Sequence, residues 1–175
     1  LADTPVTNSQ YADFVREAGY RSPAHWLNGA PPAGFENHPV IYVNRYDAEA
    51  YVTWRTKKEG RIYRIPASAE FEYAARAGDA KAKYPWGTAN PSGKANFDAT
   101  GDRHFPDWRQ HLKPVRSYPA NPWKLYGMSG NVWQMVTVNP DPAQRQWIYR
   151  LEKPYQKEAT VAGGSWARSA GYLTV

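Results

Sequence analysis

The chain has no cysteine among its 175 residues, so it can form neither a disulfide nor a metal site with thiolate ligands. It also has no apolar run of about 18 residues, and we therefore expect no membrane-spanning helix. Acidic residues are outnumbered, 16 against 22 lysines and arginines, for a net charge of +6. The basic residues are scattered, so we do not expect nucleic acid as a partner. What the chain has instead is aromatic side chains, 15% of all residues, and we expect these to stabilise its core.

The first half of the chain carries the helix signals. Helices are predicted over residues 9–19 with Asn8 as the cap, over residues 45–59 with Asn44 as the cap, and over residues 69–77. Apolar runs at residues 39–43 and 61–65 are predicted strands, and the chain beyond Asp79 is predicted to form loops and short strands. The length fits one domain, so we expect residues 1–175 to form a single α+β domain with few short helices, irregular β structure and long ordered loops.

Two glycine-rich motifs that end on aromatic residues stand out in the second half. They are Tyr-Gly-Met-Ser-Gly-Asn-Val-Trp-Gln at residues 126–134 and Gly-Gly-Ser-Trp at residues 163–166. Four further segments precede them in order, at residues 5–14, 38–51, 63–76 and 84–87. Together these segments resemble the formylglycine-generating enzyme family, also called the sulfatase-modifying factor family. The resemblance implies a variant of the C-type lectin fold across residues 1–175, without the family's first and last strands.

The resemblance also locates a would-be active site. It places the family's two copper-binding cysteines at Arg168 and Leu173, which cannot bind copper, because copper(I) selects soft sulfur ligands. We therefore expect no copper and no copper-dependent formylglycine formation. Ser165, Arg168 and Tyr172 are the candidate catalytic residues, and Trp133 and Trp166 are the candidate substrate-binding residues.

Each of these residues also has a simpler interpretation. The guanidinium of Arg168 suits a carboxylate, phosphate or phenolate of a substrate, but it can equally pair with a surface carboxylate of the chain itself. Trp133 and Trp166 can equally be core residues or cleft walls, because aromatic side chains mostly contribute through burial.

A structural calcium ion is a further expectation from the resemblance. The matching ligands are Asn96, the carbonyl of Phe97, Asp107 and the carbonyl of Arg109, and calcium prefers such mixed oxygen donors. Asp98 and Asp102 are candidates for additional charge, whereas the alternative is that Asn96 and Asp107 only cap turns. The family's second calcium site falls on Gly127, Gly130, Val132 and Gln134, which lack its anionic donor, so we expect it to be weak or empty.

Two functions remain open from the sequence. Cysteine-less relatives in the family include a periplasmic protein that matures the pyoverdine siderophore chromophore, which implies an oxidation of a small aromatic or peptide substrate in a periplasmic or otherwise extracytoplasmic location. The alternative is a non-catalytic pseudoenzyme or binding module that has a protein partner. Fold alone cannot choose between these two functions.

Overall fold

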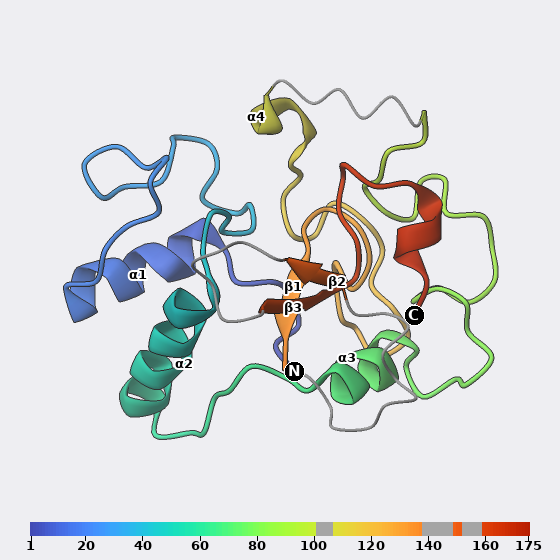
Figure 1. The fold of residues 1–175 in the computed structure, drawn as a ribbon, viewed down its shortest axis with the longest axis horizontal. Coiled ribbons are helices and arrows are strands. Elements are labelled where there is room, and N and C mark those ends of the chain that lie inside the picture. Colours follow the sequence, from blue (N-terminus) through green and yellow to red (C-terminus); the bar gives the residue numbers. More distant parts are fainter. Residues whose placement is uncertain (101–106, 138–148, 152–158) are drawn as a thin grey trace. The chain divides into compact units, whose positions relative to one another are not determined.

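A computed structural model describes residues 1–100, 107–137, 149–151 and 159–175 of the chain (Figure 1). Asp102, a candidate for extra calcium-site charge, lies outside the described residues. The chain forms two compact units, which we describe separately: a helical unit, Val6–Ile65, and a loop unit, Leu1–Pro5 with Pro66–Val175. That both belong to one domain stays a prediction. Among the described residues, no helix is long and apolar enough to cross a lipid bilayer.

The helical unit contains α1 (Asn8–Ala18) and α2 (Arg45–Glu59), and both predicted helices are confirmed. The predicted cap of α1 is wrong by one residue. Thr7 is the cap, because its hydroxyl accepts from the backbone N–H of Gln10 at 3.2 Å while the Gln10 side chain accepts from the N–H of Thr7 at 3.0 Å. Asn8 instead lies inside the helix and donates its side-chain N–H to the carbonyl of Phe35 at 2.8 Å.

Aromatic rings form the core of the helical unit, as the composition predicts. The ring of Tyr11 stacks on that of Tyr51 with centroids 5.7 Å apart, and Phe14 meets Tyr51 edge to face at 5.6 Å. All three side chains are buried, and each buried ring of this size contributes about 1.5–3 kcal/mol. The start of α2 is fixed by the predicted cap Asn44, whose side-chain oxygen accepts from the backbone N–H groups of Tyr46 and Asp47.

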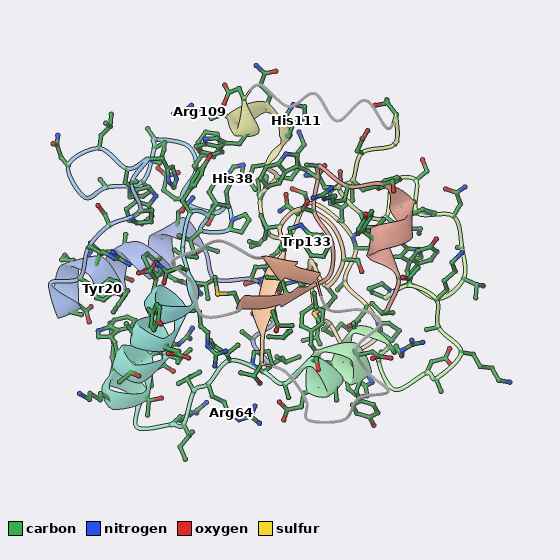
Figure 2. All side chains as sticks on the ribbon, in the orientation of Figure 1. Tyr20, His38, Arg64, Arg109, His111 and Trp133 are labelled. Atoms are coloured by element: carbon green, nitrogen blue, oxygen red, sulfur yellow. The ribbon has the colours of Figure 1, made fainter. Side chains whose placement is uncertain are left out.

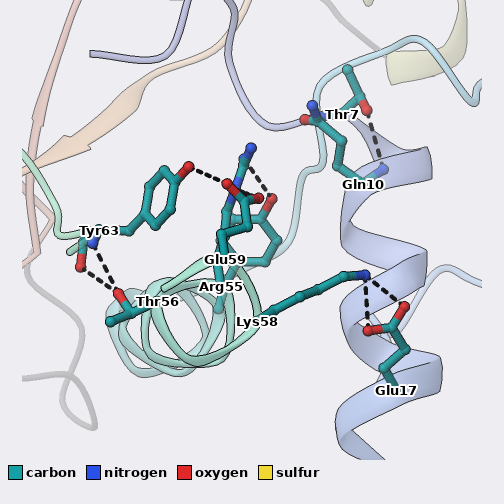
Figure 3. A network of polar contacts seen from close by, with 9 residues as sticks. Thr7, Gln10, Glu17, Arg55, Thr56, Lys58, Glu59 and Tyr63 are labelled. Atoms are coloured by element: carbon teal, nitrogen blue, oxygen red, sulfur yellow. Dashed lines mark hydrogen bonds and ion pairs between the residues drawn. The ribbon is translucent and has the colours of Figure 1, made fainter. Parts of the chain in front are cut away.

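Polar contacts join α2 to α1 and to the segment around Tyr63 (Figure 3). Lys58 binds the carboxylate of Glu17 on α1 at 2.7 Å, and Arg55 binds Glu59 at 2.8 Å. The hydroxyl of Tyr63 also donates to Glu59, and this hydrogen bond, together with the one from Arg55, lowers the pKa of the Glu59 carboxyl below its usual value. Exposed ion pairs contribute little each, so the aromatic core dominates the stability of this unit.

Neither strand predicted in this unit is present. In the segment at residues 61–65, the backbone N–H of Tyr63 donates to the hydroxyl of Thr56 at 2.8 Å instead of to a neighbouring strand. In the segment at residues 39–43, a single bridge joins Thr7 and Pro39, and Tyr42 then adopts a left-handed φ of 58°. A side chain in that conformation cannot continue a strand.

The loop unit is built from short elements and long connections (Figure 1). Its elements are α3 (Ser68–Ala75), α4 (Trp108–His111), β1 (Gln134–Val136), β2 (Tyr149–Leu151), β3 (Ala159–Ala162) and the short 3-10 helix η2 (Ala170–Leu173). The strands form one antiparallel sheet in the order β1-β3-β2, with Val161 opposite Met135 on one side and Tyr149 on the other. Helix α3 buries Phe71 and Ala75 in a core with Met128 and Val136. Few short helices, little sheet and long loops confirm the predicted α+β class.

Buried Asn121 ends helix α3 and closes the loop that follows. Its side-chain N–H groups donate to the carbonyls of Ala74 at 2.7 Å and Ala75 at 3.1 Å, while its oxygen accepts from the backbone N–H groups of Trp123 and Leu125, both at 3.0 Å. The helix is therefore shorter than the predicted range of residues 69–77. Ala77 and Gly78, at φ of 51° and 80°, already lie in the left-handed turn beyond it.

The substitution Asn121→Asp tests this cap. It replaces the donating N–H₂ group with an oxygen that faces two helix carbonyls, so the free energy of unfolding is expected to fall by about 3 kcal/mol. The matched control is Asn90→Asp, because Asn90 uses only its oxygen, which accepts from the N–H of Ser92 at 2.9 Å. Urea unfolding followed by tryptophan fluorescence measures both variants, and equal losses would contradict the proposed role.

Candidate functional site

The two glycine-rich motifs pack against each other through their backbones. Gly163 and Gly164 follow the end of β3 and have left-handed φ values of 89° and 74°. The backbone N–H of Gly130 donates to the carbonyl of Gly163 at 2.7 Å. A Cβ atom on Gly164 would lie only 2.7 Å from the carbonyl oxygen of Tyr172, so this position accepts only glycine. The motifs thereby place the segment at residues 165–172.

Asn131, in the first motif, links three loops with one buried side chain. Its backbone N–H donates to the carbonyl of Asn96 at 2.8 Å, and its carbonyl accepts from the N–H of Trp166 at 3.1 Å. Its side-chain oxygen accepts from the backbone N–H of Lys113 and from the side-chain N–H₂ of Asn96, each at 3.0 Å. Its side-chain N–H₂ donates to the backbone carbonyl of Lys113 at 2.8 Å. The predicted calcium residue Asn96 and the predicted substrate residue Trp166 are thus joined through Asn131.

Three of the predicted site residues form a chain of ring contacts. The guanidinium carbon of Arg168 lies 5.6 Å from the centre of the Tyr172 ring, and that ring meets Trp133 edge to face at 6.1 Å and 89°. Trp133 directly precedes β1, beside the small sheet (Figure 2). Arg168 is exposed, and no carboxylate of the described residues lies within 4.0 Å of its guanidinium. The alternative interpretation, in which Arg168 pairs with a surface carboxylate, therefore has no partner among the described residues.

Ser165 and Trp166 lie in the turn that leads to Arg168. The backbone N–H of Arg168 donates to the carbonyl of Ser165 at 3.1 Å, and Ser165 is buried. Trp166 is half-buried, and its indole nitrogen has no acceptor within the described segments. Thus the structure brings Ser165, Arg168, Tyr172 and Trp133 into one region, with Trp166 attached through Asn131.

The other position that the resemblance assigns to a copper-binding cysteine lies in the core. Leu173 is fully buried and packs with Tyr84 and Ala95. Ser129 of the first motif donates its hydroxyl proton to the carbonyl of Leu173 at 2.8 Å. Hence one of the two positions holds an exposed cation and the other a buried aliphatic side chain.

Three of the four predicted calcium residues lie at helix α4, which carries Arg109 and His111 (Figure 2), whereas Phe97 packs against the core of Tyr84, Ala95 and Leu173. Asn96 donates its side-chain N–H to the carbonyl of His111 at 2.7 Å. Asp107 caps the start of the same four-residue helix, and the helical rise from Asp107 to His111 is about 6 Å. One oxygen of Asp107 accepts from the N–H of Arg109 at 3.0 Å, which is the capping role of the alternative interpretation.

Two of the predicted calcium residues each keep one side-chain oxygen that is available to a ligand. The second carboxylate oxygen of Asp107 and the side-chain oxygen of Asn96 accept no hydrogen bond from the described residues. Asp98, a candidate for extra charge, binds the N–H and hydroxyl of Thr100 at 2.9 and 2.8 Å. In the described part of the chain, no three His, Asp or Glu side chains converge, so a metal here would need amide and carbonyl oxygens in addition to the Asp107 carboxylate.

Sequence reasoning missed two polar residues that shape the site. The Gln134 side chain donates to the carbonyl of Gly127 at 2.7 Å and so ties together the two ends of the first motif, where the family's second calcium site was expected to be weak or empty. The signal was available in principle, since an amide can donate a hydrogen bond and a carboxylate cannot. The role of Asn131 had no local signal, because its partners lie 18 and 35 residues away in the chain.

The fold and this site define a small α+β protein whose ordered loops present an aromatic and cationic surface. The model of the family called "Sulfatase-modifying factor enzyme 1-like domain" matches residues 1–174. The chain therefore belongs to the sulfatase-modifying factor family, the proteins that resemble formylglycine-generating enzymes.

Relatives in this family carry different names. A formylglycine-generating enzyme of Streptomyces coelicolor is 31% identical over 77% of this chain and 55% of its own length. The inactive C-alpha-formylglycine-generating enzyme 2 of Mus musculus is 30% identical, with 79% and 58% covered, and a hercynine oxygenase of Mycolicibacterium smegmatis is 28% identical, with 99% and 47% covered. The chain thus spans about half the length of these relatives.

A solved structure shows the same fold. PvdO from Pseudomonas aeruginosa superposes with a TM-score of 0.67 at 22% identity, over 95% of this chain and 68% of that one. This likeness confirms the predicted fold class, and it carries no conclusion about activity at this level of identity.

The close approach at Gly164 can be tested directly. The variant Gly164→Ala is expected to lose about 2 kcal/mol or more of unfolding free energy, because it forces both a left-handed alanine and a contact with the Tyr172 carbonyl. Gly171→Ala is the matched control, since nothing lies within 4 Å of its added Cβ. Thermal and urea unfolding of the two variants decide the matter, and a stable Gly164→Ala protein would show that this packing is wrong.

Proposed function

We propose that the chain acts in the oxidative maturation of a peptide-derived or secondary-metabolite substrate, such as a siderophore chromophore of the pyoverdine type, and not in copper-dependent formylglycine formation. One observation carries the proposal. At the two positions where thiolates are expected, the chain has an exposed cation on an aromatic ring, Arg168 on Tyr172, and a core residue, Leu173. This arrangement supports a site whose chemistry begins with recognition of an organic substrate.

The described residues supply binding and orientation in this proposal. Arg168 and Tyr172 contact the substrate, with Ser165 as a neighbouring hydroxyl, and Trp133 and Trp166 form aromatic walls. Aromatic side chains hold a flat substrate through stacking, and a guanidinium orients its charged groups. The name of one relative, a hercynine oxygenase matched over 99% of this chain, supports an oxidation as the reaction class.

Comparison of metabolites tests this function. The gene is deleted in the organism of origin, and small aromatic and peptide compounds are compared by mass spectrometry with those of the parent. A less oxidised precursor, with more hydrogen or less oxygen than the parent's product, is expected to accumulate. The native gene should remove it, and the double variant Arg168→Gln, Tyr172→Leu should not. Conversion of a sulfatase-type cysteine peptide to an aldehyde by the purified protein with copper would overturn the proposal.

The alternative function is a non-catalytic binding module. It is favoured by the lack of cysteine together with 30% identity to a relative whose name describes it as inactive. In that case the deletion leaves the metabolites unchanged, and the protein isolated from its source carries a protein partner. A periplasmic or otherwise extracytoplasmic location is part of the oxidative proposal, and fractionation of the same cells tests it.

We also propose a structural calcium ion at the start of α4. Asn96 and Asp107 would supply side-chain oxygens, and Phe97 and Arg109 would supply backbone carbonyls. The free oxygens on Asn96 and Asp107 support this assignment, because a hard cation favours carboxylate, amide and carbonyl ligands. The ion would join the loop of Asn96 to the segment of α4, which Asn131 already links through Asn96 and Lys113.

The variant Asp107→Asn tests the ion separately from the cap. Asparagine caps helices as well as aspartate does, so melting in a chelator should stay the same. The lost charge should weaken calcium binding by about tenfold or more, because ligand charge sets calcium affinity. Melting of both proteins is followed against calcium concentration, with magnesium as the control. Calcium-insensitive melting of the unaltered protein would remove the proposed ion.

A further inference from the structure

We infer that the site recognises a ligand with an aromatic ring and a carboxylate, and that Arg168 binds this carboxylate. The inference rests on the proposed function, since it assigns a substrate class to the same site. It predicts that the charge of the ligand decides affinity and that the surrounding rings hold its flat body.

Arg168 is held in place by its backbone while its side chain stays exposed. Its N–H donates to the carbonyl of Ser165 at 3.1 Å, and its own carbonyl accepts from the N–H of Asp98 at 3.0 Å. Both backbone groups are therefore used, and the turn cannot shift without breaking them. An arginine fixed in this way loses less freedom when it binds a ligand.

A comparison with similar arginines shows what is unusual about Arg168. Four arginines of the described residues lie over aromatic rings: Arg55 over Tyr63, Arg109 over Trp108, Arg116 over Tyr126 and Arg168 over Tyr172. The first three also bind a carboxylate, namely Glu59, Asp107 and Asp3. Within the described ranges, Arg168 is the one that has the ring but not the carboxylate.

The carboxylate of Asp98, a neighbour of Arg168, is hydrogen-bonded to Thr100. The backbone of Asp98 touches that of Arg168, yet the Asp98 side chain is buried and accepts from the N–H and hydroxyl of Thr100. Among the described residues, no carboxylate binds the guanidinium, so we expect it to accept a carboxylate from outside.

The chemistry of the surroundings defines the ligand. A guanidinium binds a carboxylate through two parallel hydrogen bonds, and one cation balances the single negative charge of such a group. The guanidinium lies over the ring of Tyr172, and Trp133 meets Tyr172 at 89°, so a second ring stands at a right angle to the ring that the cation covers. A flat aromatic ring packs on such surfaces better than a flexible chain does.

Binding of small probes tests the inference without any turnover. The probes are 4-hydroxybenzoate, its neutral analogue 4-hydroxybenzamide, and cyclohexanecarboxylate, which keeps the charge and loses the ring. Their affinities are measured by ligand-observed NMR titration and calorimetry. We expect the unaltered protein to bind 4-hydroxybenzoate about tenfold more tightly than either analogue, as expected for one charge-assisted pair and one ring contact.

Variants assign the preference to Arg168. Arg168→Gln should remove the preference for the acid over the amide, and Arg168→Lys should restore part of it, because lysine keeps the charge but lacks the planar fork. The matched control is Arg116→Gln, which removes another arginine that lies over a tyrosine ring and should leave the preference unchanged. Unaltered melting temperatures show that the variants fold.

The outcomes separate this inference from the proposed function. Equal affinity for acid and amide, no binding of the acid, or a preference that survives Arg168→Gln would overturn the inference even if deletion of the gene alters metabolites. A clear preference for the acid together with unchanged metabolites would instead uphold the charged aromatic ligand and reject the oxidation.

Discussion

The loops of the candidate site depend on the side chain of Asn131. Its amide and backbone together bind Asn96, Lys113 and Trp166, which belong to three different loops. A buried polar group left without its partner costs about 1–3 kcal/mol, so movement of any one loop penalises the other two. Asn131 also has a left-handed φ of 64°, which asparagine tolerates better than most residues. Long loops can therefore remain ordered here with very little sheet or helix to support them.

Glycine contacts turn that order into a defined position for Tyr172 and Arg168. Gly130 binds Gly163 through the backbone, and Gly164 lies against the Tyr172 carbonyl, where any side chain would collide. The Tyr172 ring then supports the guanidinium of Arg168 from below. Because these contacts involve backbone atoms on both sides, the fold itself sets the backbone positions of Tyr172 and Arg168.

How far the sequence predicts this structure depends on the range of each interaction. Helix α2 is predicted correctly because its signals, Asn44 and Gly60, are adjacent to it in sequence. The cap of α1 is displaced by one residue, since Thr7 and Asn8 are both good caps and local periodicity does not separate them. The predicted strand at residues 61–65 is absent because a threonine on α2 takes the backbone donor, and the cap of α3 comes from Asn121, 47 residues away from its partner Ala74. Resemblance to a family predicts the fold and the candidate site residues, but the contacts of Asn131, with partners 18 and 35 residues away, lie beyond both kinds of reasoning.

Loss of the cysteine pair changes what kind of ligand the site can accept. A thiolate pair concentrates negative charge and soft donors, which attract copper(I). An arginine at one of these positions does the opposite, because a permanent positive charge repels any metal cation and attracts anions. The second position that the resemblance assigns to cysteine is Leu173, which is buried in the core with Tyr84 and Ala95 and offers no ligand to a metal. In our proposal, the two positions that the resemblance assigns to a copper site belong instead to a site for an anionic organic molecule.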